Sequence, residues 1–235
     1  MESVRISSRS LHICMHLKTN RQGCSCPCFR LHAVYRKENQ MGKVFWEGSA
    51  QLAPVPPALV TCGTMEEPNV LTIAWTGIIC TRPAMTYISV RPSRYSYGLI
   101  RQTGEFAINL TPSRLVKAAD FCGVRSGAQV DKFAQCGLHP LPAQRISAPI
   151  LEECPVALEC RVTESRLLGT HELFLAEILG VDVDEQYLDS KGGLNLQQCG
   201  LAAYAHGEYF ALGRKLGDFG FSVRKRKRSS DRMSK

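Results

Sequence analysis

The sequence predicts a mainly β domain, in which an antiparallel barrel carries a few inserted helices. About six or seven short segments rich in apolar and β-branched residues lie between residues 58 and 212, and helical spacing of apolar residues occurs at only two places among them. A doubly wound parallel sheet requires strands that alternate regularly with helices, and this chain lacks that alternation. An antiparallel barrel with helical excursions therefore fits the pattern best.

The first half of the barrel is expected to contain four strands and one helix. Residues 58–63 and 69–76 are predicted strands, and the Gly, Glu and Pro residues between them predict a hairpin. A further strand is expected over 85–90. Apolar residues at helical spacing over 95–103, followed by a glycine, predict the first helix, and the next strand is expected over 105–110.

The second helix has a start signal in its sequence. Thr111 is expected to cap it and Pro112 to occupy its first position, so that it runs to about residue 121 and ends at Gly123. The chain from there to Pro149 is predicted to be a loop with one helical turn near 131–134.

Two strands and one ambiguous segment are expected after this loop. Apolar and polar residues alternate over 156–162, which is typical of a strand with one buried face. The longer strand expected over 171–184 is apolar on both faces, so one face can line the barrel and the other needs a helix or a second subunit to cover it. Residues 201–212 have no clear period and are left as loop with a short strand or helix.

The net charge of +8 comes from the two ends of the chain. Residues 1–40 hold 7 Lys and Arg against 2 acids, residues 223–235 hold 7 against 1, and residues 41–222 hold 15 against 18. A slightly acidic body offers no surface for tracking phosphates, so we do not expect nucleic acid to be a partner. No apolar run approaches the ~20 residues that cross a bilayer, so no membrane partner is expected either.

Eleven cysteines do not indicate a disulfide framework, because their number is odd and most lie in apolar stretches. A reducing, cytoplasmic location is therefore expected. Cys24, Cys26 and Cys28 alternate with other residues and have no partner pair, which is poor geometry for a metal site, and no metal is expected.

Residues 1–40 and 224–235 are expected to lie outside the folded domain, which spans 41–223. The first segment is interpreted as a disordered or non-native leader before Met41, with a transit peptide as the alternative. The second is interpreted as a basic disordered tail, with a nuclear address or an RNA contact as alternatives.

The common nucleotide and hydrolase signatures are absent, including GxGxxG, GxxxxGK[ST], GxSxG and HExxH. The strongest polar cluster is residues 91–96, which follow a predicted strand and open a predicted helix. This cluster combines two arginines, two serine hydroxyls and the backbone amides of a helix start. Such a combination is suited to binding an anion.

From about Gly42 to Arg224 the chain resembles the flavin reductase-like family, of the flavoredoxin type. Four strings carry the resemblance in order: Asn-Val-Leu-Thr-Ile-Ala-Trp at 69–75, Ser-Val-Arg-Pro-Ser-Arg-Tyr-Ser at 89–96, Phe-Cys-Gly-x-x-Ser-Gly-x-x-x-Asp-Lys-Phe at 121–133 and Tyr-Ala-His-Gly-Glu-Tyr-Phe at 204–210. The family implies an antiparallel split β-barrel of Greek-key type, a homodimer and FMN held noncovalently, with NADH or NADPH as electron donor.

The resemblance also implies roles for individual residues. Arg91, Ser93 and Arg94, with Ser96, would bind the FMN phosphate, and His206 would act at the nicotinamide side as the catalytic residue. The full set of implied cofactor-binding residues is Asn69, Val70, Leu71, Thr72, Trp75, Thr76, Ser89, Arg91, Ser93, Arg94, Ser96, Cys122, Gly123, Ser126, Gly127 and Lys132. Three alternatives stay open: Trp75 as a core aromatic, Lys132 paired with Asp131, and His206 as a structural residue.

The function implied is an FMN-binding oxidoreductase that transfers a hydride from NAD(P)H to FMN and passes electrons to an acceptor. The alternative is an FMN-binding electron carrier that a redox protein partner reduces. Flavin chemistry demands little acid–base work from a protein, which must mainly hold the ring and the phosphate. The absence of common catalytic motifs is therefore compatible with either function.

Overall fold

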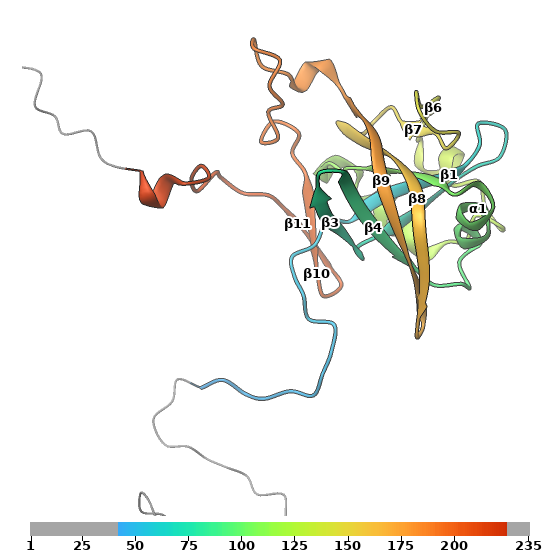
Figure 1. Ribbon diagram of the computed structural model, residues 1–235, viewed down its shortest axis with the longest axis horizontal. Coiled ribbons are helices and arrows are strands. Elements are labelled where there is room, and N and C mark those ends of the chain that lie inside the picture. Colours follow the sequence, from blue (N-terminus) through green and yellow to red (C-terminus); the bar gives the residue numbers. More distant parts are fainter. Residues whose placement is uncertain (1–41, 225–235) are drawn as a thin grey trace, which may run out of the picture. The chain divides into compact units, whose positions relative to one another are not determined.

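The computed structural model describes residues 42–224 (Figure 1). Residues 42–48 contain no helix or strand. The expected leader and nearly all of the expected basic tail lie outside the described residues. None of the described helices is long and apolar enough to cross a bilayer.

The folded body is mainly β, as predicted. Its main sheet is formed by β1 (Ala58–Gly63), β2 (Pro68–Ile73), β3 (Thr76–Thr81), β4 (Ala84–Val90), β5 (Glu105–Asn109), β8 (Val156–Leu168) and β9 (His171–Val183). The helices are α1 (Tyr95–Thr103), α2 (Val116–Val124) and α3 (Lys132–Cys136). Two small hairpin-like pairs complete it: β6 (Pro140–Leu141) with β7 (Ile150–Leu151), and β10 (Ala202–Ala205) with β11 (Glu208–Ala211).

The seven-stranded sheet has the order β2-β1-β5-β8-β9-β4-β3, and each neighbouring pair is antiparallel. Its two edge strands, β2 and β3, are separated in the chain by only Ala74 and Trp75. The sheet must therefore curl until its edges come together, although no pairing joins β2 to β3 in the described residues. The result is a barrel that is not closed, and the long β8–β9 hairpin forms part of its wall (Figure 1).

The main core fills the concave side of this sheet. Phe106, Phe174, Ile88 and Val60 are buried there with Ile100, which α1 contributes. Burial of large side chains of this kind is worth roughly 1.5–3 kcal/mol each. This core is the reason that the strands carry apolar residues at alternate positions.

A second core lies on the other face of β1 and β2, under α2 and α3. Leu59 and Val70 point into it and meet Ala119 and Cys122 of α2. Because β1 is covered on both faces, all six of its residues are buried. This explains its continuous apolar sequence and fixes α2 beside the end of β2.

A buried polar contact fixes α1 against β9. Glu172 accepts hydrogen bonds from Tyr97 Oη at 2.5 Å and from Arg101 Nη1 at 3.0 Å. The hydrogen bond from Tyr97 and the charge of Arg101 lower the pKa of the Glu172 carboxyl. The contact holds α1 in the position from which its first turn reaches the functional site described below.

Several predicted boundaries are wrong. Residues 69–76 do not form one strand, because the chain turns at Ala74 and Trp75 and continues as β3, which was not predicted as a strand. Thr111 does not cap a helix, because its hydroxyl donates to the carbonyl of Pro57. A 3-10 turn at Ser113–Leu115 precedes α2 instead, with Pro112 as its N-cap.

Three further segments differ from the prediction. Gly123 does not end α2, which continues to Val124. The helical turn predicted near 131–134 is present as α3, which Asp131 caps by accepting from two backbone amides, whereas β6 in the same predicted loop was not expected. Residues 201–212 contain β10 and β11, joined by a turn in which His206 and Gly207 both have positive φ. Positive φ at both central residues is typical of a type I′ hairpin turn, which His-Gly signals less strongly than Asn-Gly.

Candidate functional site

Two adjoining recesses open where β2 and β4 end beside α2. The larger recess has a volume of about 450 Å³ and the smaller one about 80 Å³. They share the lining residues Leu71, Thr72, Arg94 and Gly123, so they form one continuous site with a wide and a narrow part.

The smaller recess lies at the start of α1. This helix has no side-chain cap and no acidic residue in its first turn, so its first amide groups lack side-chain acceptors. Ser93 and Ser96 line the recess, and Asn69 Nδ2 lies 2.5 Å from Ser96 Oγ as a hydrogen-bond donor. The helix dipole and these donors favour an anion at this point.

Lys132 supplies a buried positive charge to the same recess. The side chain is 3% exposed, and Nζ donates to the carbonyl of Val70 at 2.7 Å and to that of Cys122 at 2.9 Å. No ion pair involves Lys132 or Arg94 within residues 42–224. Burial lowers the pKa of the Lys132 ammonium, and the nearby charge of Arg94 lowers it further. Two cations that converge without a counterion indicate that the site is built for an anionic ligand.

The loop that covers this recess requires glycine at position 127. A Cβ atom there would lie 2.1 Å from Asn69 Oδ1 and 3.2 Å from Tyr95 Cδ1. Because Asn69 is buried and bonded to Ser96, it has little room to withdraw. Gly127 therefore allows Ser126 and its neighbours to pass close to the start of α1.

One wall of the larger recess is aromatic. Trp75, at the link between β2 and β3, stacks on His171 with ring centroids 6.3 Å apart and an interplanar angle of 9°. Trp75 is 49% exposed and lines the recess, so it is not a core aromatic. Burial and the charge of Arg91 lower the pKa of His171, so this ring is neutral at neutral pH. The wall is suited to a flat ring system.

The β10–β11 hairpin also lines the larger recess. Tyr204 and Tyr209 meet edge to face with centroids 5.2 Å apart, and Tyr209 Oη donates to Asp120 Oδ1 of α2 at 3.4 Å. Burial and the charge of Asp120 raise the pKa of Tyr209 to about 12. The phenol therefore stays protonated and links the hairpin to α2 beside the recess.

Most of the predicted cofactor-binding residues line these recesses. They are Leu71, Thr72, Trp75, Ser89, Arg91, Ser93, Arg94, Ser96, Cys122, Gly123, Ser126, Gly127 and Lys132. Asn69, Val70 and Thr76 do not line either recess. Asn69 supports Ser96, the Val70 carbonyl accepts from Lys132, and Thr76 Oγ1 donates to the Tyr87 carbonyl.

The structure gives no side-chain role to His206. It lies exposed in the β10–β11 turn, and Gly207 lines the larger recess beside it. His171, Asp120, Tyr204 and Tyr209 line the recess but were not among the predicted site residues. The two tyrosines flank the His-Gly turn in the sequence, and reading that turn as a hairpin would have paired them.

The geometry answers one of the open alternatives and describes the state of the cysteines. Lys132 does not pair with Asp131, whose carboxylate caps α3. Cys122 is buried, and burial raises its thiol pKa to about 12, so it is not a thiolate nucleophile at neutral pH. The seven cysteines among the described residues are all free.

A comparison of the sequence with models of known protein families identifies the family of this domain. The family model "Flavin reductase like domain" matches residues 51–213, which is most of the chain. The chain belongs to the flavin reductase-like family. A protein with a split barrel domain from Shewanella frigidimarina superimposes with a TM-score of 0.63 at 22% identity, and its fold agrees with the curled, unclosed antiparallel sheet.

Two solved structures and one curated protein represent the relatives of this flavin reductase-like chain. Flavoredoxin of Desulfovibrio vulgaris (Miyazaki F) superimposes with a TM-score of 0.73 at 31% identity, over 78% of this chain and 100% of that one. Flavoredoxin from Methanosarcina acetivorans gives 0.71 at 26% identity with the same coverage. An NADPH-flavin oxidoreductase of Streptomyces viridifaciens is 30% identical over 56% of this chain and 68% of its own length.

Proposed function

We propose that this chain binds FMN noncovalently, with the flavin ring in the larger recess and the phosphate in the smaller one. The observation that carries the proposal is the pair of unpaired cations, Lys132 and Arg94, beside the uncapped start of α1. A phosphate supplies the counterion that this arrangement lacks. The flavoredoxin relatives and the family match support the same ligand class.

The shape and chemistry of the two recesses support this division. A volume of about 450 Å³ lies in the range of pockets that hold drug-sized ligands, and its Trp75–His171 wall is flat and aromatic. The smaller recess offers hydroxyl and cationic side chains, among them Ser93, Ser96 and Lys132. A ligand with a planar ring and an anionic tail fits both parts.

We further propose that the chain is an NAD(P)H:flavin oxidoreductase. A bound flavin supplies hydride and electron transfer, which no side chain of this site provides. The chain's own residues would hold the ring at the Trp75–His171 wall and the β10–β11 hairpin, and the donor would approach along the same recess. His206 in the same turn remains the predicted contact for the nicotinamide. The NADPH-flavin oxidoreductase relative supports this activity.

A second candidate is an FMN-binding electron carrier that a redox protein reduces. The two flavoredoxin structures among the relatives favour it, because both cover 78% of this chain. Both candidates use the same FMN site and differ in the source of electrons.

One experiment separates these proposals. Purified protein is loaded with FMN under anaerobic conditions, and flavin absorbance is followed after addition of NADH or NADPH. Rapid bleaching by one nucleotide is expected for the reductase. Bound FMN that is not bleached by either nucleotide would overturn the reductase proposal and favour the carrier. Failure to bind FMN would overturn both.

We also propose that the chain forms a homodimer. The face of β9 that points away from the core carries Leu173 and Leu175, and the end of the strand exposes Val181. Ile78 on the edge strand β3 is 67% exposed. Apolar area of this kind is typical of a subunit interface. Sedimentation velocity at micromolar concentration should give a dimer, and a monomer would contradict the proposal.

A further inference from the structure

The loop over residues 142–149 is fastened to the sheet by a buried carboxylate of β8. Glu159 is 1% exposed, and it accepts the backbone N–H of Gln144 at 2.9 Å and that of Arg145 at 2.6 Å. Each carboxylate oxygen holds one amide, so the position of this loop segment depends on Glu159.

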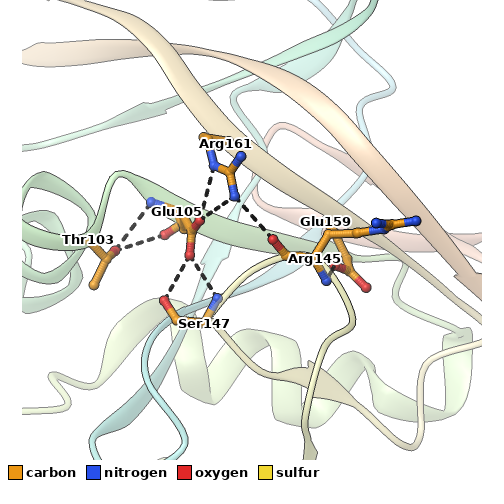
Figure 2. A network of polar contacts seen from close by, with 6 residues as sticks. All are labelled: Thr103, Glu105, Arg145, Ser147, Glu159 and Arg161. Carbon is orange, nitrogen blue, oxygen red and sulfur yellow. Dashed lines mark hydrogen bonds and ion pairs between the residues drawn. The ribbon is translucent and has the colours of Figure 1, made fainter.

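A second carboxylate fixes the next part of the loop. Glu105 of β5 accepts the N–H and the hydroxyl of Ser147 at 2.7 and 2.8 Å, and Arg161 donates to Glu105 at 3.0 and 3.1 Å (Figure 2). Between the two anchors, Ile146 packs against Ala107 on the face of β5 opposite the main core. Both anchors are acids, but only Glu105 has a cation as partner.

Glu159 has another acid as its neighbour instead. Glu159 pairs with Gly180 and Ala157 pairs with Asp182 across β8 and β9, so Asp182 lies diagonally from Glu159 on the same face. Gln144 joins the two side chains, because its backbone N–H donates to Glu159 Oε1 at 2.9 Å and its Nε2 donates to Asp182 Oδ1 at 3.4 Å. Gly180 lies opposite Glu159 on this face, and a Cβ there would be at an ordinary contact distance of 3.6 Å from Glu159 Cδ.

The oxygens of Asp182 do not find enough donors. Oδ1 accepts from Gln144 Nε2 at 3.4 Å, while Oδ2 is buried and has no hydrogen-bond partner among the described residues. A buried acceptor without a donor costs free energy. Two ionised carboxylates at these diagonal positions would add repulsion to this cost.

No cation in the surroundings removes this repulsion. Arg161 is committed to Glu105 and to the carbonyl of Arg145, and neither Arg145 nor Arg161 forms an ion pair with Asp182 or Glu159 in the part of the chain that the structure describes. Asp184, just beyond β9, adds another negative charge on this side. Among the described residues, therefore, no ion pair neutralises either carboxylate.

We propose that Asp182 and Glu159 share one proton, and that this proton acts as a pH-sensitive clasp for the 142–149 loop. A proton on Asp182 turns two facing acceptors into a donor and an acceptor and satisfies the buried oxygen. Its loss replaces the hydrogen bond by repulsion. Asp182, which is partly exposed, then turns toward solvent, and the loop loses its contact through Gln144.

The pH range of the clasp follows from its surroundings. Burial and the hydrogen bond and charge of Glu159 raise the pKa of Asp182 to about 6, from an ordinary value of 3.8. A carboxyl whose pKa is raised by folding stabilises the folded state below its ordinary pKa and loses that contribution as the pH rises through the raised value. The clasp is therefore closed at pH 5 and weakened at pH 7.5.

Two measurements on the full-length protein test the clasp. Carbon NMR of the side-chain carboxyls should give Asp182 a midpoint near 6. Hydrogen exchange of the Gln144 and Arg145 amides should show protection factors, corrected for intrinsic rates, that fall about tenfold between pH 5 and 7.5. A midpoint near the ordinary value of 3.8, or protection that does not change, would overturn the proposal.

Three variants make the result specific. Asp182→Asn keeps a donor toward Glu159 without a titrating proton, so its protection should no longer depend on pH. Glu164→Gln changes an exposed acid of the same strand and should behave as the wild type does. Glu159→Gln should move the Asp182 midpoint toward its ordinary value. A pH-dependent loss of protection that persists in Asp182→Asn would contradict the shared proton.

Discussion

Replacement of Arg94 by alanine tests the placement of the phosphate. Arg94 lines both recesses, and its positive charge lowers the pKa of buried Lys132. A phosphate between them would therefore interact with both cations. Truncation leaves that phosphate without one charge-assisted contact. This should weaken FMN binding by about 2–4 kcal/mol, or ~30- to ~700-fold in Kd.

Riboflavin provides the control for this substitution, because it has the same ring and no phosphate. Its Kd should barely change in Arg94→Ala, as measured by quenching of flavin fluorescence. Arg166→Ala removes an exposed arginine outside both recesses and should leave both Kd values unchanged. Equal losses of FMN and riboflavin in Arg94→Ala would refute the assignment of the smaller recess to the phosphate.

Arg91 gives a contrasting expectation, because it lines only the larger recess. Its charge would lie near the ring and stabilise the anionic reduced flavin. Arg91→Ala should therefore weaken FMN and riboflavin alike and shift the flavin reduction potential downward, as measured by equilibration with a redox dye. Selective loss of FMN with an unchanged potential would assign Arg91 to the phosphate instead.

Other parts of the chain give independent expectations. Gly127→Ala should weaken FMN binding by about tenfold, because the added Cβ would displace the buried side chain of Asn69. The control Gly98→Ala lies in open space on α1, so it should keep FMN binding and stabilise the fold by roughly 0.5–1 kcal/mol. The pKa of Glu172 is lowered by folding, so this carboxylate stabilises the fold above the ordinary value of 4.5 and loses that contribution as the pH falls below it. The melting temperature of Glu172→Gln should therefore be lower than that of the wild type at pH 7, and the two should converge in acid. Deletion of residues 1–40, or of the residues after Val223, should leave FMN affinity, flavin reduction and melting temperature unchanged, and a fall of several degrees would contradict this.

Local sequence patterns were sufficient to predict most of the fold. The alternation of Val156 with its neighbours predicts β8, and the span of α1 agrees with the predicted helix at both ends. The prediction failed where tertiary contacts override local signals. Thr111 has the sequence context of a helix cap, but its hydroxyl bonds to Pro57, far away in the chain.

The candidate site was predictable where a short string carries its own chemistry. The cluster at 91–96 combines cations with a helix start, and most of its side chains line the recesses. His171 and Asp120 were missed, because only the folding of β9 and α2 around the recess brings them there. The sequence also gave no sign that Lys132 would be buried against two carbonyls, which required α3 to pack on β2.

The absorbance spectrum of the purified full-length protein tests the central claim most directly. Binding of FMN predicts that the protein either carries the visible bands of an oxidised flavin or perturbs these bands when FMN is added in stoichiometric amount. Acid denaturation should then release FMN. The bound-flavin bands, or the change in the bands of added FMN, should be much weaker in Arg94→Ala. A protein without flavin bands that also leaves the spectrum of added FMN unchanged would contradict the account.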